Sequence, residues 1–266
     1  AQLLSSDAEI ELVGAIGRPK ASYIGKDVGE MTTGTPTGIL VSNVIEELPA
    51  GAKPDVLLDL SLGEAAFDTA KRALERGVRP VIGASGLGAE HIEVLTKLAH
   101  SKRLGALVVP NFSVGAVLMM EFARQAGAFF ENVEIVEMHH PKKVDAPSGT
   151  AMHTVSKLAS HKKQFNKSDV QEKELLPHAR GAKAESGIRV HSLRLPGLIS
   201  HQEVIFGAPG ELFTVRHDSF NTDCFSKGIK MAILAVMKLD QLMVGLDKVI
   251  SLNGTETGAR IGGRSS

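Results

Sequence analysis

The first half of the chain alternates short apolar runs with longer stretches in which apolar residues recur every three or four positions. Runs such as "IELVGAI" and "DVLLDLS" are typical of strands buried on both faces, and the periodic stretches predict amphipathic helices. We predict strands at 10–16, 55–61, 80–85 and 104–110, and helices at 64–77 and 89–101. Phe67, Ala70 and Leu74 share one face of the helix 64–77, which Gly77 ends. This alternating order is that of a doubly wound parallel sheet.

The pattern changes after about residue 110. A long, largely buried helix is predicted first, then a strand, a helix, three further strands and a final apolar helix. The predicted ranges are 113–130, 133–140, 150–161, 188–195, 200–207, 211–218 and 225–243. The stretch 162–187 is polar and has too few apolar residues to fold alone. Proline and glycine between the last three strands are typical of turns.

These elements predict two domains. The first is an α/β domain with a doubly wound parallel sheet, formed by residues 1–112 together with 222–250, because the apolar final helix can return to it. Residues 113–221 form a second domain of strands and helices, of the α+β type. Residues 251–266 are interpreted as a disordered or artificial tail.

Composition excludes several classes of protein. The 266 residues include 30 basic and 30 acidic ones, and this balance argues against binding to nucleic acid or to a membrane surface. No apolar run approaches the ~20 residues of a membrane span, and the start has no signal-peptide pattern. A single cysteine, Cys224, excludes an internal disulfide framework and favours a reducing, cytoplasmic setting.

The stretch "HHPKKVDAPSGT", residues 139–150, combines two imidazoles, two ammonium groups and a helix start. Side chains alternate faces along a strand, so His139 and His140 are expected to point in opposite directions. They cannot then chelate one metal ion together, and we predict no metal site.

The helix start itself can receive an anion. The amides of Ser148, Gly149 and Thr150 are expected to point out of the helix, where the partial positive charge favours a carboxylate or phosphate. A nearby lysine would add charge, and a histidine could exchange protons near neutrality. The plainer alternative is a capped helix after a solvated loop, with histidines that only satisfy core hydrogen bonds. The residues alone leave both interpretations open.

The segment "EMHHPKKVDAPSGTA" closely resembles the signature of the 4-hydroxy-tetrahydrodipicolinate reductase family. Four other segments add to the resemblance. "VIGASG" is similar to the family's cofactor loop, "PNFSVG" matches a further family segment, and "HSLRLPGLISHQEVIFG" and "RHDSF" resemble its later strands. The resemblance covers roughly residues 9 to 250.

The resemblance implies a Rossmann-type domain that binds NADH or NADPH, and a mixed-sheet domain that binds substrate and builds a homotetramer. It implies reduction of a cyclic dicarboxylate in lysine biosynthesis, in the cytoplasm or, in a plant or alga, in the plastid. His139 would handle the proton, and Lys143 would be a second acid that also holds the substrate. Substrate contacts would come from His140, Ser148, Gly149 and Thr150. Cofactor contacts would come from Gly83, Ala84, Ser85, Val109, Pro110, Asn111 and Phe112.

One departure from the family pattern lies at the start of the chain. The family begins with a strand and a G-x-x-G-x-x-G turn that holds the cofactor pyrophosphate, and neither is present here. The glycine-rich "GARIGGR" has no helix after it and is no substitute. We therefore expect a fragment of a longer protein, which would bind a dicarboxylate better than a nicotinamide cofactor, or a relative with an impaired cofactor site.

A second departure concerns the cofactor's ribose. Where an acidic residue often holds the 2′-hydroxyl of NADH, this chain has Gly17, followed by Arg18 and Lys20. These cations can pair with a 2′-phosphate, so NADPH is favoured and NADH stays possible. The alternative is a solvated basic turn.

Two competing functions remain at this stage. The chain could be a non-catalytic dicarboxylate-binding relative, or another two-domain reductase acting on a semialdehyde. The presence of both His139 and Lys143 favours the reductase of lysine biosynthesis, because binding alone needs no proton donor.

Overall fold

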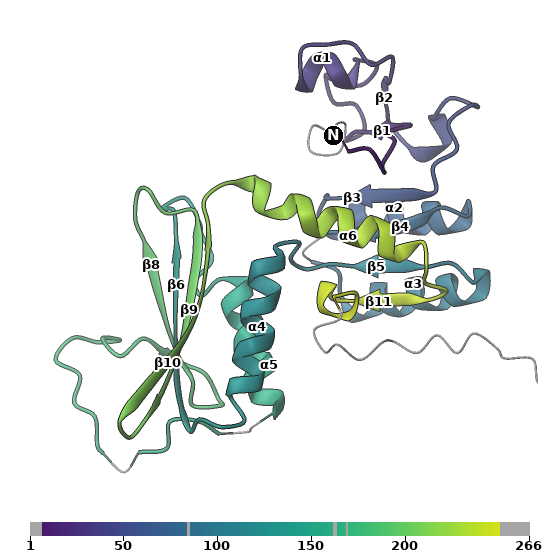
Figure 1. The fold of residues 1–266 in the computed structure, drawn as a ribbon. Helices are drawn as coiled ribbons and strands as arrows, with labels where there is room; N and C mark the ends of the chain where they lie inside the picture. The colour runs from purple at the N-terminus through teal and green to yellow at the C-terminus, as the bar shows by residue number, and fades with distance from the viewer. Residues whose placement is uncertain (1–6, 84–85, 162–163, 169, 251–266) are drawn as a thin grey trace, which may run out of the picture. The chain divides into compact units, whose positions relative to one another are not determined.

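The computed structural model describes residues 7–83, 86–161, 164–168 and 170–250. The chain divides into two compact units (Figure 1). Unit 1 contains residues 1–112 and 225–266, and unit 2 contains residues 113–224. The predicted tail, Ala84 and Ser85 lie outside the described residues. Within the described part of the chain, no helix is long and apolar enough to cross a membrane.

Unit 1 is built on a four-stranded parallel sheet. Its strands are β3 (Val56–Asp59), β4 (Arg79–Ile82), β5 (Ala106–Val108) and β11 (Leu242–Val244), in the order β11-β5-β4-β3. The first three were predicted. The apolar residues of β4 and β5 are buried as expected for strands covered on both faces, whereas Val56, Leu57 and Leu58 of β3 are only half-buried.

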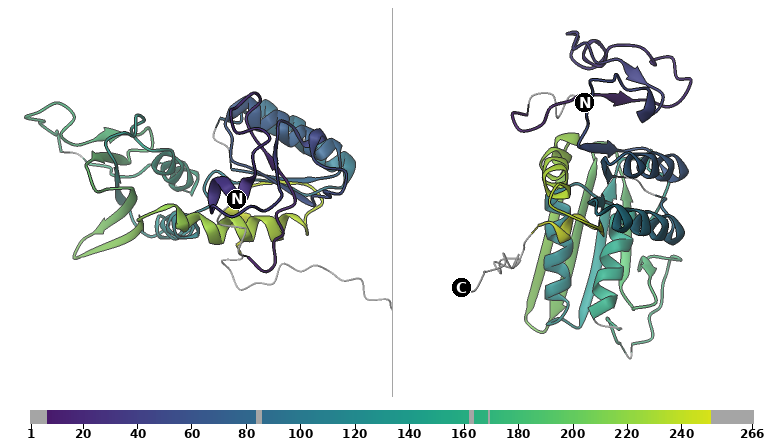
Figure 2. Two further views of the ribbon diagram at one scale, coloured as in Figure 1. Left: turned by 90° about the horizontal axis from the view of Figure 1, so that it is seen from above. Right: turned by 90° about the vertical axis from the view of Figure 1, so that its right-hand side faces the viewer.

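Helices cover both faces of this sheet (Figure 2). They are α2 (Gly63–Glu75), α3 (Ala89–Lys102) and α6 (Ser226–Val236). In α2, Ala70 and Leu74 are fully buried, and Gly77 ends the helical segment with a φ of +81°. The doubly wound arrangement predicted from the sequence is therefore confirmed.

The predicted strand 10–16 is wrong in extent and in its partner. Only β1 (Ala15–Ile16) forms, and it pairs with β2 (Val41–Ser42) in a separate two-stranded parallel sheet. A continuous apolar run needs hydrogen-bonded neighbours to become a long strand, and β2 is its one partner among the described residues. The short helices nearby are α1 (Val28–Thr32) and the 3-10 helix η1 (Ile45–Glu47).

Two helix ends also differ from the prediction. The final helix stops at Val236, and residues 242–244 form β11 along the open edge of β5. The long helix after residue 112 is α4 (Val114–Ala126), which stops before Gly127 and leaves Phe129 84% exposed. Apolar composition alone cannot separate a helix end from an added strand.

Unit 2 is a five-stranded mixed sheet in the order β10-β9-β6-β8-β7. The strands are β6 (Asn132–His139), β7 (Ala182–Lys183), β8 (Arg189–Arg194), β9 (Ser200–Ala208) and β10 (Glu211–Ser219). β6 pairs in parallel with β8 and antiparallel with β9, so the expected mixed sheet is confirmed. The 3-10 helices η2 (Thr222–Phe225) and η3 (Leu246–Lys248) complete the elements of the chain.

Two helices, α4 and α5 (Gly149–His161), lie against one face of the unit 2 sheet (Figure 2). Val133 and Ile135 of β6 point into this interface with Leu158 of α5, and all three are almost fully buried. The alternation of β6 thereby sends Glu137 and His139 toward the same face as Val133 and Ile135.

The polar stretch 162–187 is anchored more firmly than its composition predicts. Phe165 is 1% exposed and belongs to the unit 2 core. The Asn166 side chain accepts a hydrogen bond from the amide of Val133 at 2.8 Å and donates to the carbonyls of Val133 and Gly187 at 2.7 and 3.0 Å. One buried ring and one amide therefore attach this segment to the sheet.

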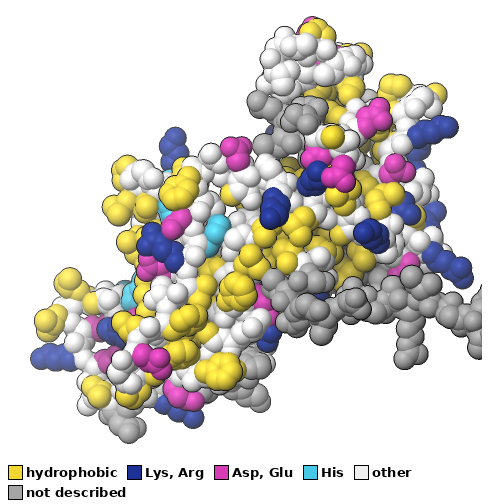
Figure 3. All heavy atoms as spheres, in the orientation of Figure 1, with side chains coloured by type: hydrophobic (Ala, Val, Ile, Leu, Met, Phe, Trp, Pro, Cys, Tyr) yellow, Lys and Arg dark blue, Asp and Glu magenta, His cyan; other side chains and the backbone are white. Residues whose placement is uncertain are grey.

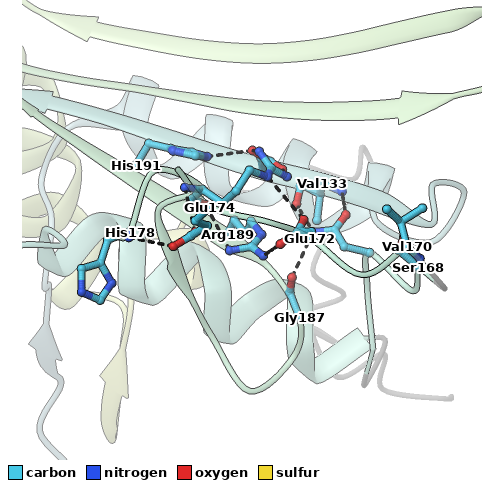
Figure 4. A network of polar contacts seen from close by, with 12 residues as sticks. Val133, Ser168, Val170, Glu172, Glu174, His178, Gly187, Arg189 and His191 are labelled. Carbon is cyan, nitrogen blue, oxygen red and sulfur yellow. Dashed lines mark hydrogen bonds and ion pairs between the residues drawn. The ribbon is translucent and has the colours of Figure 1, made fainter. Parts of the chain in front are cut away.

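Charged residues extend this attachment (Figure 4). Arg189 pairs with Glu172, and His191 Nε2 lies 2.7 Å from Glu134. These groups help to line a cavity of about 1140 Å³ on the sheet face away from α4 and α5. The candidate catalytic residues do not line it.

Candidate active site

The candidate site begins with two residues that share one face of β6. Glu137 and His139 are separated by two positions, so both side chains point to the face that α5 covers. Arg194 lies directly opposite His139 in the β6–β8 register. β6 ends at His139, and His140 is exposed beyond the strand. The alternation of side chains along a strand therefore sets the direction of His139, but it does not apply to His140, which lies outside the strand.

The Glu137 carboxylate is the centre of the cluster. Its side chain is fully buried, and it accepts two hydrogen bonds from the Arg194 guanidinium at 2.8 and 2.9 Å. The amide of Ser148 donates to Oε1 at 3.2 Å. His139 Nδ1 lies 2.6 Å from Oε2. A buried carboxylate needs such partners, because an unpaired buried charge is strongly unfavourable.

These contacts decide the protonation states. Burial raises the pKa of Glu137, but hydrogen bonds from Arg194, Ser192 and His139 outweigh it and hold this pKa below its ordinary value. Burial lowers the pKa of His139. Glu137 partly offsets that effect, and the charges of Lys143 and Arg194 lower the pKa further. An ionised Glu137 can only accept, so Nδ1 of His139 is the donor in this pair.

Lys143 and Lys142 have different surroundings. Lys143 Nζ donates to both carboxylate oxygens of Asp145 at 2.8 and 2.9 Å, and its side chain is 21% exposed. Lys142 is exposed. Only Lys143 is therefore held in a fixed place, next to a carboxylate that a ligand anion could replace.

The start of α5 differs in part from the expected receptor. Ser148 is buried; its amide donates to Glu137, and its Oγ accepts from the amide of Ala151 at 3.2 Å. Ser148 therefore caps the helix. Its backbone amide is already engaged by Glu137, so it is not available for the predicted direct contact with substrate. Gly149 is exposed, and a Cβ built on it would meet no atom within 4 Å. This leaves Gly149 and half-buried Thr150 as the accessible part of the helix start.

In unit 1, the predicted cofactor residues lie at the carboxyl ends of the parallel strands. Gly83 follows β4, and a Cβ there would lie 2.4 Å from a ring carbon of Phe112, so no side chain fits. Val109 and Phe112 are buried and Pro110 is exposed, with Asn111 half-buried between. The side chains of Val109 and Phe112 thus support the loop, and a ligand there would meet backbone atoms.

The basic turn after β1 is open. Arg18 and Lys20 are exposed, and the amide of Arg18 donates to the hydroxyl of Tyr23 at 3.2 Å. A Cβ on Gly17 would lie 2.5 Å from a Tyr23 ring carbon and 2.8 Å from Val41. Glycine is needed at position 17 for packing, so an added carboxylate there would disrupt the turn.

Comparison with known families identifies the chain. The sequence profile "Dihydrodipicolinate reductase, N-terminus" matches residues 1–112, and "Dihydrodipicolinate reductase, C-terminus" matches residues 115–250. The chain belongs to the dihydrodipicolinate reductase family. It is thus an oxidoreductase of a family that depends on a pyridine nucleotide.

Relatives of known function support this family membership over most of the chain. The 4-hydroxy-tetrahydrodipicolinate reductase of Synechococcus elongatus is 44% identical over 246 residues, which are 91% of this chain and 90% of the relative. The enzyme of the same name from Bacillus subtilis is 48% identical over 198 residues, or 74% of each chain. These matches favour an enzyme over the non-catalytic alternative.

Solved structures agree with the fold. Dipicolinate-bound dihydrodipicolinate reductase from Paenisporosarcina sp. TG-14 has a TM-score of 0.82 and 40% identity, covering 94% of this chain and 93% of that one. An amine dehydrogenase from Mycobacterium smegmatis has a TM-score of 0.58 at 16% identity, covering 89% and 88% of the two chains, which shows similarity of fold alone.

The carboxyl ends of the unit 1 strands carry glycines where the pyridine nucleotide of this reductase family would bind. Gly63 and Gly86 follow β3 and β4, with φ angles of +53° and +90°. A Cβ on Gly86 would lie 3.5 Å from the Cα of Gly63. Glycine backbone at the carboxyl ends of parallel strands is where dinucleotides bind in such sheets. These residues would hold part of the cofactor, whereas the G-x-x-G-x-x-G turn that holds the pyrophosphate in the family is not among the residues of this chain.

Two residues of the cluster around His139 were not predicted from the sequence: Glu137 and Arg194. Glu137 was visible two positions before His139, a spacing that places both on one strand face. Arg194 lies 55 residues after His139 in the chain and only the β6–β8 pairing brings it into place. Among the described residues, no group of three or more His, Cys, Asp or Glu side chains could hold a metal ion.

Proposed function

We propose that this chain catalyses the NADPH-dependent reduction of 4-hydroxy-tetrahydrodipicolinate, or of dihydrodipicolinate, to tetrahydrodipicolinate in the diaminopimelate route to lysine. The observation that most directly supports this proposal is the cluster of residues at the end of β6. A partly buried imidazole, a fixed lysine and an open helix start occur within twelve residues of the chain. The name of the dipicolinate-bound relative supports a cyclic dicarboxylate as ligand.

The residues of unit 2 divide the chemistry between them. Reduction adds a hydride and a proton, and a hydrated ring also loses water. His139 is the proton donor through Nε2, because Nδ1 is engaged by Glu137. Lys143 leaves Asp145 to pair with a substrate carboxylate and can supply a second proton. The backbone of exposed Gly149 and half-buried Thr150, aided by His140, receives a carboxylate at the helix N-terminus.

The cofactor, when bound, supplies the hydride. Gly83, Pro110, Asn111 and the backbone of Val109 and Phe112 would hold it at the strand ends, and the predicted residues Ala84 and Ser85 belong to the same segment. Exposed Arg18 and Lys20 support NADPH over NADH, because two cations near the ribose favour a 2′-phosphate.

An absorbance assay tests this function. The chain is preceded by the family's N-terminal strand and glycine-rich turn and is given substrate generated by the upstream synthase, with NADPH and NADH in separate reactions. The chain without these additions is the comparison, and we expect it to show little or no reductase activity. We expect the extended chain to oxidise both reduced nicotinamides, faster with NADPH at low cofactor concentration. Lack of synthase-dependent oxidation by the extended chain with either cofactor would contradict the proposal.

We also propose a cytoplasmic homotetramer assembled through unit 2. Support comes from the sheet face away from α4 and α5, where Val136 and Ile205 are only half-buried and Leu212 is 76% exposed. Exposed hydrophobic side chains also occur elsewhere on both units (Figure 3). Light scattering after size-exclusion chromatography measures the mass, and a monomer would contradict the proposal.

A further inference from the structure

Glu137 does not touch the solvent, yet it contacts three parts of the site. Its carboxylate joins the proton donor His139, the guanidinium of Arg194 and the amide of Ser148 at the start of α5. These partners come from β6, β8 and the segment that leads into α5. One buried side chain therefore fixes the histidine relative to the helix start.

The orientation of the His139 ring follows from this contact. The ring has two nitrogens, and a neutral imidazole carries its proton on only one of them. Glu137 stays ionised because Arg194 donates two hydrogen bonds to it, so its oxygen at 2.6 Å must accept the proton of Nδ1. Within the described residues Nε2 has no hydrogen-bond partner, and this nitrogen is left for proton transfer.

The charge balance around His139 points the same way. The charged groups that act on the ring are Glu137 from β6, Arg194 from β8 and Lys143 from the loop after β6. Only Glu137 is negative, so it alone among these three favours the protonated, donating form of the imidazole. The two cations oppose that form.

We propose that Glu137 is the positioning residue of the proton donor: it selects the Nδ1–H form of the His139 ring, keeps Nε2 available to the substrate, and links the ring to the carboxylate receptor at the start of α5. Arg194 serves by holding the Glu137 carboxylate in place. The inference rests on the proposed reductase function.

Glu137→Gln tests the role with little change of shape. We expect kcat to fall about 10²-fold, the lower end of what a positioned acid contributes, with KM changed less than about threefold. We also expect the alkaline fall of the kcat/KM profile to move to lower pH, because the variant loses the negative charge of Glu137, which favours protonated His139. Glu137→Asp should restore part of kcat and move the profile back.

Glu134→Gln is the matched control. Glu134 lies on the same strand, and it also pairs with a histidine, His191, at 2.7 Å and with Arg180. Its side chain is on the opposite sheet face, away from His139. The control should retain kcat and the pH profile, whereas a general effect of removing a charge from β6 would appear in both variants.

A measurement without substrate separates this inference from the proposed function. Long-range ¹H–¹⁵N NMR on the ¹⁵N-histidine-labelled full chain reports which ring nitrogen is protonated, and His139→Gln assigns the signal. We expect neutral His139 to carry its proton on Nδ1 in the wild type. A proton on Nε2, or a Glu137→Gln enzyme with wild-type kcat and pH profile, would overturn the proposal. An inactive wild type with Nδ1 protonated would count against the reductase function alone.

Discussion

At His139, burial and an adjacent carboxylate act in opposite directions on one imidazole. Burial is the larger effect and lowers the pKa, so less of the ring is protonated at neutral pH than in a solvated histidine. An acid of this kind works only in its protonated form. Wild-type kcat/KM is therefore expected to fall as the pH rises through the lowered pKa of His139.

Replacing His139 by Gln removes the proposed acid and keeps a polar side chain. We expect kcat to fall about 10²–10⁴-fold while KM changes much less, because the loss affects proton transfer rather than anion binding. Steady-state kinetics with synthase-generated substrate measures both constants. Turnover within about twofold of the wild type would remove His139 from the mechanism.

The two neighbouring lysines allow a direct comparison. Lys143→Ala should raise KM and lower kcat, each about tenfold or more, because the proposed roles of its ammonium are to pair with a substrate carboxylate in place of Asp145 and to supply a proton. Lys142→Ala should stay within about twofold, since Lys142 is exposed. Similar losses at the two positions would mean that the loop acts through its total charge.

The residue scale also shows where sequence reasoning stops. His139, Lys143, Gly149 and Thr150 lie in one short motif, so their nearness follows from the chain itself. Arg194 reaches Glu137 only through strand pairing that no local pattern reports. Ser148 shows a different limit. The sequence predicts an unpaired amide at the start of the helix, but in the structure this amide donates a hydrogen bond to Glu137.

Among the elements, the polar segment 162–187 places one aromatic ring, that of Phe165, in the unit 2 core. Phe165→Ala should destabilise the protein by about 3–5 kcal/mol, because it would leave a cavity in a packed core. Leu175→Ala is the control, since Leu175 in the same segment is 87% exposed. Urea unfolding followed by circular dichroism compares the two variants. Equal stability would show that Phe165 does not anchor the segment.

Helices were predicted better than strand partners for a physical reason. The face and end of α2 depend on residues within a few positions, such as Leu74 and Gly77. A strand depends on what lies beside it, so residues 10–16 shortened to β1 and residues 242–244 became β11. In both places the neighbouring strand determined the length of the strand that formed. That neighbour is distant in the sequence, so the local pattern does not reveal it.

For the molecule as a whole, we propose that Arg18 and Lys20 of unit 1 set the cofactor preference, so that it can be changed without altering unit 2. The double variant Arg18→Glu and Lys20→Glu should raise KM for NADPH about tenfold or more and change KM for NADH far less, because the new carboxylates repel the 2′-phosphate. Gly17 is left unchanged, since its position has no room for a side chain. Kinetics with each cofactor decides, and parallel changes for both would locate the phosphate elsewhere.

The order of the chain has a consequence for its synthesis on the ribosome. Unit 2 is one uninterrupted segment, whereas unit 1 is closed only when β11 pairs with β5 and α6 covers the sheet. The inner segment is therefore fully translated, with all its partners present, while the outer unit still exposes an apolar sheet face and an unpaired strand edge. We therefore expect unit 2 to fold first during synthesis, and unit 1 to complete its sheet only after the more than 130 residues that follow β5 have been added.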